Sequence, residues 1–382
     1  MQVFIVSMLV CSILIVLLRK VAYRLDFVDR PGGRKQHGQP TPTVGGLAMF
    51  AAVLVAMLAS NSLHGNVGIL LGCAAALMML GALDDKYGMS VSLRLMIQVF
   101  LVTLVIVGAE GTVTHLGALI GRDVPLGMFA IPFSVVAFVG GDQCDQHADG
   151  MAGKMALITT LGVAVIFYVA GAVDLLPLTW VMLGALIGFL FLNSRLFVKR
   201  AWVFMGDAGS MWLGLVLGWF MAQLTQNTVS AEPALVLWMF GIPLIDALAV
   251  MFRRAMHKRS PFKADRTHIH YLLRHMGFST KRNVLMLSLA QLLLVGIGII
   301  FYLEHVPAWV IFWSFVLLLV IYYYLFHKDR KGGRRKYTAV IYLELDDRRK
   351  NSGNGRTGER RKHTAELFQD LDERRQKTGG RG

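Results

Sequence analysis

Blocks of apolar residues alternate with short polar connections along most of the chain. Each block holds roughly 17–22 residues, which is the length that crosses the hydrocarbon core of a bilayer as an α-helix. The pattern therefore predicts an all-α, polytopic integral membrane protein with about eleven transmembrane helices. The expected spans lie near residues 1–18, 43–62, 66–82, 94–109, 125–140, 155–173, 176–194, 208–226, 231–252, 284–302 and 306–326.

Lys and Arg concentrate in every second connection. Residues 19–42, 195–207 and 253–283 are basic, whereas 61–66 and 303–306 carry little or no charge. The positive-inside rule then places the basic connections and the C-terminus in the cytoplasm and the N-terminus outside. The same positional bias accounts for the net charge of +15, so no nucleic-acid partner is expected.

The composition changes after residue 327. Residues 1–327 form the predicted multi-span domain, and residues 328–382 form a basic, Gly-containing tail. A segment this polar cannot bury a core, so we expect a disordered cytoplasmic tail. Its positive charge would attract anionic lipid headgroups, and a specific partner for it stays open.

The segment 201–210, Ala-Trp-Val-Phe-Met-Gly-Asp-Ala-Gly-Ser, is a polar break between two apolar blocks. Gly206 and Gly209 flank Asp207 and permit close backbone approach. We expect Ser210 to cap the helix that follows, leaving amide N–H groups facing an anion. A carboxylate at such a helix start suits a divalent cation that also holds phosphate oxygens. The alternative is a tight interhelical turn with a capping aspartate.

Other carboxylates fall on the same predicted cytoplasmic side. Asp84 and Asp85 end the third span, and the run 141–150 contains three further aspartates. Carboxylates at a membrane boundary are candidates for function. Brought together, they would hold Mg²⁺ or Mn²⁺ and leave positions for substrate phosphates. Adjacent carboxylates suit one metal ligand and one proton acceptor; an ordinary acidic loop is the alternative.

Two histidines, His268 and His270, lie in the longest basic connection. A zinc site built on both would lack a nearby third ligand, so phosphate contact by this connection is favoured. Asp246 is the one charged residue expected well inside a span. A transporter of lipid-linked or nucleotide sugars would instead carry several charges or broken helices near mid-membrane.

Several motifs in order resemble the polyprenyl-phosphate N-acetylhexosamine-1-phosphate transferase superfamily (glycosyltransferase family 4), and within it the WecA-type undecaprenyl-phosphate N-acetylglucosamine-1-phosphate transferases. The residues that carry the resemblance are Asp29-Arg-Pro31, Arg34-Lys35 with His37, Pro42-Thr-Val-Gly-Gly46, Leu83-Asp-Asp85, Asn193, Val203-Phe-Met-Gly-Asp-Ala-Gly-Ser210, Pro243-Leu-Ile-Asp246, Ser260-Pro-Phe262 and Asp265-Arg-Thr-His-Ile-His270.

One motif departs from the family pattern. The superfamily has Asp-Gly-x-Asp-Gly in the connection after the fifth span, whereas this chain has only Asp149-Gly150. Matching Asp149 to the second aspartate puts Gln146 at the first, whereas matching it to the first requires a deletion of about three residues. Asp142 and Asp145 are the alternative sources of the missing carboxylate. A carboxamide does not give a metal the charge of a carboxylate, so the departure bears on activity, metal affinity or choice of sugar.

The resemblance implies Mg²⁺-dependent transfer of a sugar-1-phosphate from a UDP-N-acetylhexosamine to undecaprenyl phosphate with release of UMP. GlcNAc is the expected sugar and an O-antigen or common-antigen type of surface glycan the expected product. It also implies a bacterial inner (plasma) membrane, a periplasmic N-terminus and a cytoplasmic active site. A homodimer stays open, as does a catalytically altered member that only binds lipid or nucleotide sugar.

The resemblance also implies roles for individual residues. Asp207, with Asp149, would hold Mg²⁺, with Mn²⁺ as an alternative. Asp84 or Asp85 would position or deprotonate the lipid phosphate while the other supports the metal site. Catalytic or substrate-contacting roles follow for Asp149, His268 and His270, and substrate binding for Asn193, Arg266, Arg34, Lys35 and His37.

Overall fold

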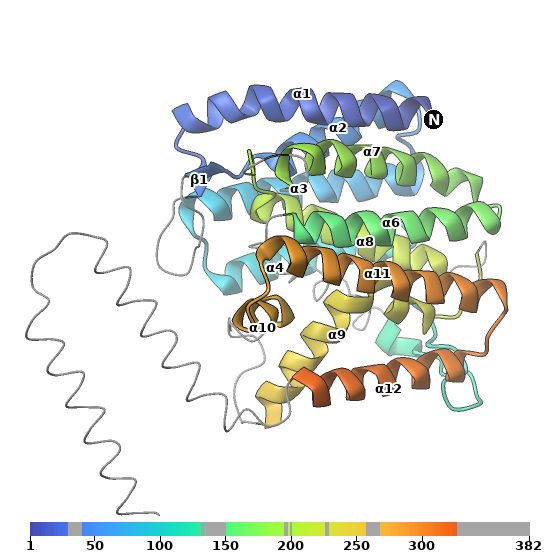
Figure 1. Cartoon of the computed structure of the whole chain (residues 1–382). Helices are drawn as coiled ribbons and strands as arrows, with labels where there is room; N and C mark the ends of the chain where they lie inside the picture. Colours follow the sequence, from blue (N-terminus) through green and yellow to red (C-terminus); the bar gives the residue numbers. More distant parts are fainter. Residues whose placement is uncertain are drawn as a thin grey trace, which may run out of the picture. The chain divides into compact units, whose positions relative to one another are not determined.

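A computed structural model describes residues 1–29, 40–130, 134, 150–194, 198, 201–225, 229–256 and 268–326. Helices dominate this part of the chain (Figure 1). They are α1 (Gln2–Arg24), α2 (Gly45–Ala59), α3 (Gly65–Tyr87), α4 (Val91–Gly108), α6 (Met151–Val169), α7 (Leu176–Asn193), α8 (Gly206–Leu224), α9 (Leu235–Met256), α10 (Ile269–His275), α11 (Thr280–Leu303) and α12 (Ala308–Phe326), with the short 3₁₀ helices η1 (Gly127–Phe129) and η2 (Val173–Leu175).

The predicted all-α membrane fold is confirmed in outline, but the count of eleven spans is not. Among the described residues, eight helices are long and apolar enough to cross a bilayer. The expected span 43–62 contains only the 15-residue α2. The expected span 125–140 is described at residues 125–130 and 134 alone, where η1 is found. The expected span 208–226 corresponds to α8, which has 19 residues but is not among the eight.

The structure places α8 in the interior of the helical assembly. Every residue from Ala208 to Leu224 is buried. Its indole groups bond to neighbouring backbone, with Trp212 donating to the Gly46 carbonyl at 3.2 Å and Trp219 to the Ala109 carbonyl at 2.7 Å. Because protein surrounds α8 on all sides, it tolerates polar and small residues that a lipid-facing helix would not. This interior position explains why α8 is less apolar than the eight candidate spans.

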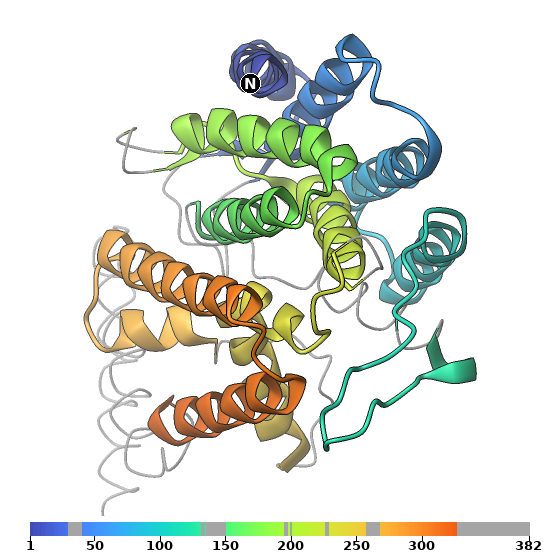
Figure 2. The same ribbon diagram turned by 90° about the vertical axis from the view of Figure 1, so that its right-hand side faces the viewer.

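Two groups of helices lie on either side of α6. Figure 2 shows α1, α2 and α7 on one side of α6 and α9, α10, α11 and α12 on the other. α1 packs on α7, α3 on α8, and α11 on both α6 and α9. The buried apolar residues form two clusters, one including Phe167 of α6, Phe189 of α7 and Trp212 of α8, the other including Trp238 of α9 and Phe315 of α12.

Two irregular features matter for the site. The strands β1 (Val28–Asp29) and β2 (Thr41–Pro42) pair in antiparallel fashion and close the basic connection between α1 and α2. Helix α9 is broken at Gly241, where φ is 41° and ψ is −115°, two residues before Pro243. The Gln291 side chain from α11 fills this break: it accepts from the Ile242 N–H at 2.8 Å and donates to the Met239 carbonyl at 2.9 Å.

Candidate active site

The end of α3 lies directly on the first turn of α8 because small residues face each other there. A Cβ atom added to Gly81 would lie 2.5 Å from both the Cα and the backbone nitrogen of Ala208. Only a glycine permits that approach. The contact carries the last turn of α3, with its two carboxylates, to the start of α8.

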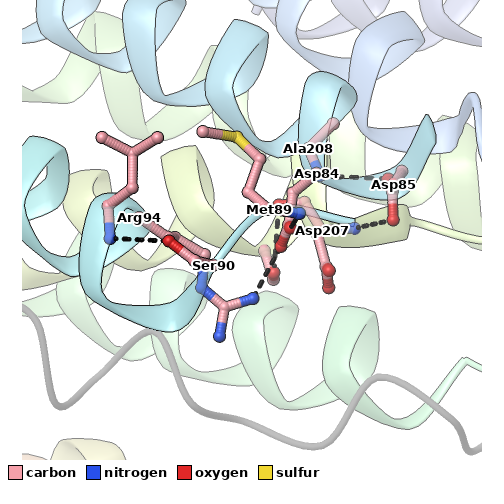
Figure 3. Close-up of polar contacts among 9 residues, drawn as sticks. Asp84, Asp85, Met89, Ser90, Arg94, Asp207 and Ala208 are labelled. Atoms are coloured by element: carbon pink, nitrogen blue, oxygen red, sulfur yellow. Dashed lines mark hydrogen bonds and ion pairs between the residues drawn. The ribbon is translucent and has the colours of Figure 1, made fainter. Parts of the chain in front are cut away.

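Asp85 accepts hydrogen bonds from the first turn of α8. Its Oδ1 lies 3.1 Å from the Asp207 amide nitrogen and its Oδ2 lies 3.4 Å from that of Ala208 (Figure 3). The first amide groups of a helix have no partner within the helix and carry partial positive charge. A carboxylate from another helix therefore caps α8.

The prediction that Ser210 caps this helix is wrong. Helix α8 begins at Gly206, whose φ of +74° is accessible mainly to glycine. Ser210 lies inside the first turns, buried, and its hydroxyl donates to the Asp207 carbonyl at 3.3 Å. Asp85 does the capping instead.

Asp84 has a different environment from its neighbour. Its Oδ2 lies 2.6 Å from Nη1 of Arg94, and its Oδ1 accepts the Met89 N–H at 2.7 Å. The Asp84 side chain is 6% exposed and that of Arg94 26%. Figure 3 shows the guanidinium of Arg94, on α4, directed toward Asp84 in the last turn of α3. Asp84 is thus held by a cation, and Asp85 by amide groups.

Sequence reasoning missed Arg94. A signal was present, since Arg94 is a lone cation at the first position of the expected span 94–109. Buried or half-buried charges at a membrane boundary require a partner, and Asp84 stands ten residues earlier. Arg94 lies in the first turn of α4, which Ser90 caps by accepting the Leu93 N–H. From there its guanidinium pairs with Asp84.

Asp207 and Asn193 lie at the two ends of the connection between α7 and α8. Asp207 is half-buried in the first turn of α8. Asn193 ends α7 and donates through Nδ2 to the Val203 carbonyl at 2.7 Å. Its Oδ1 is buried and accepts no hydrogen bond within the described chain. A Cβ atom added to Gly150, the residue before α6, would lie 2.9 Å from this oxygen.

These donors fit a hard divalent cation. Carboxylate and amide oxygens are the ligands that Mg²⁺ and Mn²⁺ take in proteins, and a buried amide oxygen without a donor suits such a cation. No group of three His, Cys, Asp or Glu side chains close enough to hold a metal ion occurs in the described part of the chain. Asp149, the second expected metal ligand, lies outside it.

His268 belongs to a second polar cluster, formed with side chains of α9 and α12. His268 precedes the first residue of α10, and its Nδ1 lies 3.0 Å from Oδ2 of Asp246. Oδ1 of Asp246 accepts the Ile269 N–H at 3.0 Å and the Tyr322 hydroxyl at 2.6 Å. Sequence reasoning noticed Asp246 without giving it a role and missed Tyr322.

His270 is placed differently from His268. It is buried within α10, its ring packs against Tyr271, and Asn283 donates to its backbone carbonyl at 2.7 Å. The two imidazole rings are nearly parallel, with centroids 6.2 Å apart. His268 is therefore the more accessible of the pair, with a side chain 23% exposed.

Both polar clusters lie at the same end of the helices. Figure 1 shows the α3–α4 turn and α10 at one end, and the N-terminus of α1 at the other. This agrees with the expectation that the polar residues share one face. The predicted site residues Arg34, Lys35, His37, Asp149 and Arg266 lie outside the described residues.

The eight apolar helices and the carboxylate cluster at one end define a multi-pass membrane protein with a polar site at the ends of its helices. Residues 67–225 match the model of glycosyl transferase family 4. The chain is 32% identical over 349 residues to the undecaprenyl-phosphate alpha-N-acetylglucosaminyl 1-phosphate transferase of Salmonella typhi, covering 90% of this chain and 95% of the relative.

Two further relatives carry the same name. The Yersinia pestis protein is 34% identical over 312 residues, which cover 80% of this chain and 86% of the relative. The Escherichia coli (strain K12) protein is 32% identical over 322 residues, covering 83% and 88%. The chain belongs to glycosyl transferase family 4, and the resemblance drawn from its motifs is confirmed.

Proposed function

We propose that this protein transfers N-acetylglucosamine-1-phosphate from UDP-N-acetylglucosamine to undecaprenyl phosphate and releases UMP. The observation that carries the proposal is the similarity, over 90% of the chain, to a relative named for transfer of this group to this lipid. The bacterial inner membrane, a cytoplasmic site and the start of an O-antigen or common-antigen type glycan belong to the same proposal.

In the proposed reaction, an oxygen of the lipid phosphate attacks the sugar-linked phosphorus of the donor. A new P–O bond joins the two phosphates, and the bond to the UMP oxygen breaks. Such transfer depends on positioning and on stabilising negative charge. A Mg²⁺ ion held by Asp207, the Asn193 oxygen and Asp149 would neutralise charge on the pyrophosphate.

Other side chains of the protein would position the metal ligand and contact the phosphates. Asp85, in the last turn of α3, accepts from the amides of Asp207 and Ala208. These bonds fix the first turn of α8, which carries Asp207. Asp84 fixes Arg94, whose guanidinium is partly exposed and suits a phosphate oxygen. His268 lies just before α10, at the same end of the helices as Asp84 and Asp85. Its ring would contact the diphosphate of the donor.

UMP release by the purified protein tests the proposal. The assay contains undecaprenyl phosphate and UDP-N-acetylglucosamine, with Mg²⁺ or with a chelator. Asp207→Asn should lower release at least ~100-fold, the scale of removing one preorganised electrostatic partner. Asp174→Asn makes the same chemical change at an exposed residue of η2, beyond the far end of α6, and should leave release unchanged.

Other outcomes would separate the alternatives. Release with a different UDP-sugar alone would assign the departure at residues 141–153 to sugar choice. Folded protein that binds nucleotide but releases no UMP with any donor would refute the transferase and favour a binding role. Full activity of Asp207→Asn would remove this residue from the metal site.

A further inference from the structure

Asp246 is a carboxylate buried within a membrane-crossing helix, and three donors converge on it. It is 7% exposed and lies in the half of α9 that follows the break at Gly241. Its two oxygens take the His268 ring nitrogen, the Ile269 N–H and the Tyr322 hydroxyl, at 3.0, 3.0 and 2.6 Å. Such a group is costly in a bilayer unless it is satisfied. These contacts satisfy it.

The arrangement fixes the tautomer of His268. A carboxylate accepts hydrogen bonds only, so the Nδ1 atom that faces Asp246 carries the proton. The neutral ring then presents Nε2 as an acceptor, and a doubly protonated ring presents a second donor. A carboxylate behind an imidazole also holds the ring in one orientation. Asp246 thus determines which way His268 faces and which nitrogen it presents.

Tyr322 completes this arrangement from the last helix. Its ring is 7% exposed and packs against Phe326, with centroids 5.0 Å apart. Phenylalanine would pack equally well at that position. The hydroxyl is explained by its bond to Asp246, which is short, as expected for O–H donating to a carboxylate. Oδ1 of Asp246 thus accepts from the Ile269 N–H of α10 and from the Tyr322 hydroxyl of α12. The carboxylate cannot rotate without losing these two hydrogen bonds.

We infer that Tyr322 is a positioning residue for His268 and acts through Asp246. The inference rests on the proposed function for its catalytic consequence, since that function places His268 at the diphosphate. It connects α12, which contributes no residue to the family motifs in this chain, to the site. Without the hydroxyl, Asp246 and the imidazole sample several orientations, and fewer complexes are correctly arranged for transfer.

Steady-state UMP release by Tyr322→Phe gives the first test. We expect kcat to fall about tenfold, the lower range for loss of an outer hydrogen-bond partner of a functional histidine, with little change in KM for the donor. Tyr323→Phe is the matched control, because that hydroxyl lies 3.3 Å from Sδ of Met256 and not at Asp246. It should match the unmodified protein.

Measuring Tyr322→Phe in a protein that lacks His268 shows whether its effect on kcat depends on that histidine. In a His268→Gln protein, adding Tyr322→Phe should cause no further loss, because the group being positioned is gone. Equal fractional losses with and without His268 would overturn the inference. So would an unchanged kcat in Tyr322→Phe.

A spectroscopic measurement keeps the inference separate from the proposed function. In protein labelled with ¹⁵N-histidine, the signals lost in His268→Gln belong to His268. We expect a protonated Nδ1 and an unprotonated Nε2 in mildly alkaline buffer, and a changed tautomer mixture in Tyr322→Phe but not in Tyr323→Phe. If that change occurs while no donor yields UMP, the proposed function fails and the positioning stands. Identical His268 signals in the unmodified protein, Tyr322→Phe and Tyr323→Phe would refute the positioning role of Tyr322, whatever the activity.

Discussion

Arg94 reaches from the start of α4 to Asp84 at the end of α3, with its Nη1 2.6 Å from Oδ2 of the carboxylate. The pair spans the turn between two helices that both meet the membrane boundary. Asp84 is almost wholly buried and Arg94 is partly exposed. The guanidinium therefore compensates a charge that the fold could not otherwise bury at this position.

Removing this cation should destabilise the protein. We expect Arg94→Met to lower the free energy of unfolding by about 2 kcal/mol, less than the ~3–5 kcal/mol of a fully buried pair because Arg94 keeps contact with solvent. Thermal unfolding in detergent gives the measurement. The double variant Arg94→Met/Asp84→Asn should recover part of the loss, since no unpaired charge remains. A double variant less stable than Arg94→Met would contradict this account.

Gly206 permits the contact between Asp85 and α8. Alanine at this position adds a Cβ 2.5 Å from Oδ2 of Asp85 and keeps a φ of +74°. The backbone term alone costs about 1–2 kcal/mol. Gly171 is the matched control, because its φ is +71° and its Cβ would meet nothing within 4 Å.

We expect Gly206→Ala to lose more stability than Gly171→Ala and to lose most UMP release, whereas Gly171→Ala loses stability alone. The difference between the two gives the combined effect of the contacts that the new Cβ makes with Asp85 and with the Thr43 carbonyl oxygen, 2.9 Å away. Equal stability losses in both variants, with full UMP release in each, would show that these contacts have no consequence.

The sequence predicted those parts of the site that are local in the chain. The end of α3 at Asp84 and Asp85 follows from an apolar block that stops at two charges, and the structure has it there. The partner of Asp85 could not be predicted, because Asp207 is 122 residues away and the bond exists only once α3 packs on α8. Local propensity favoured Ser210 as the cap, and this tertiary contact replaced it.

The same limit applies to the membrane helices. Hydropathy identified the eight described helices that are long and apolar enough to cross a bilayer. It predicted a span for 43–62 that is shorter in the structure, where α2 begins at Gly45 and ends at Ala59. Tyr322 gave no signal at all, since one tyrosine among aromatic neighbours is typical of a membrane helix. Its partner Asp246 lies 76 residues earlier.

Asp85 has a structural bond and a proposed chemical role, and one substitution separates them. Asp85→Asn keeps an oxygen that can accept from one amide of α8 but removes the charge. We expect a stability loss of about 1 kcal/mol, as for loss of a helix cap, and a fall in UMP release of at least ~100-fold. Unfolding and turnover measured on the same preparation give both values. Loss of activity only in proportion to lost folded protein would reduce Asp85 to a cap.

The break in α9 should depend on Gln291. This side chain is fully buried and bonds the Ile242 N–H, the Met239 carbonyl and the Thr159 hydroxyl. Leucine has a similar volume but leaves the Ile242 N–H without its acceptor, which costs about 1–3 kcal/mol in an apolar interior. Thr159 still donates to the Met239 carbonyl at 3.0 Å, so that oxygen keeps one partner.

Thermal unfolding of Gln291→Leu therefore should show a loss of that size. Ser288→Ala, one turn earlier on α11, is the control, because its hydroxyl bonds only the Val284 carbonyl of its own helix among the contacts described. It should stay within ~0.5 kcal/mol of the unmodified protein. Because the half of α9 after the break carries Asp246, we also expect Gln291→Leu to disturb the His268 signals. Unchanged stability in Gln291→Leu would mean that the break is held by Gly241 and Pro243 without help from α11.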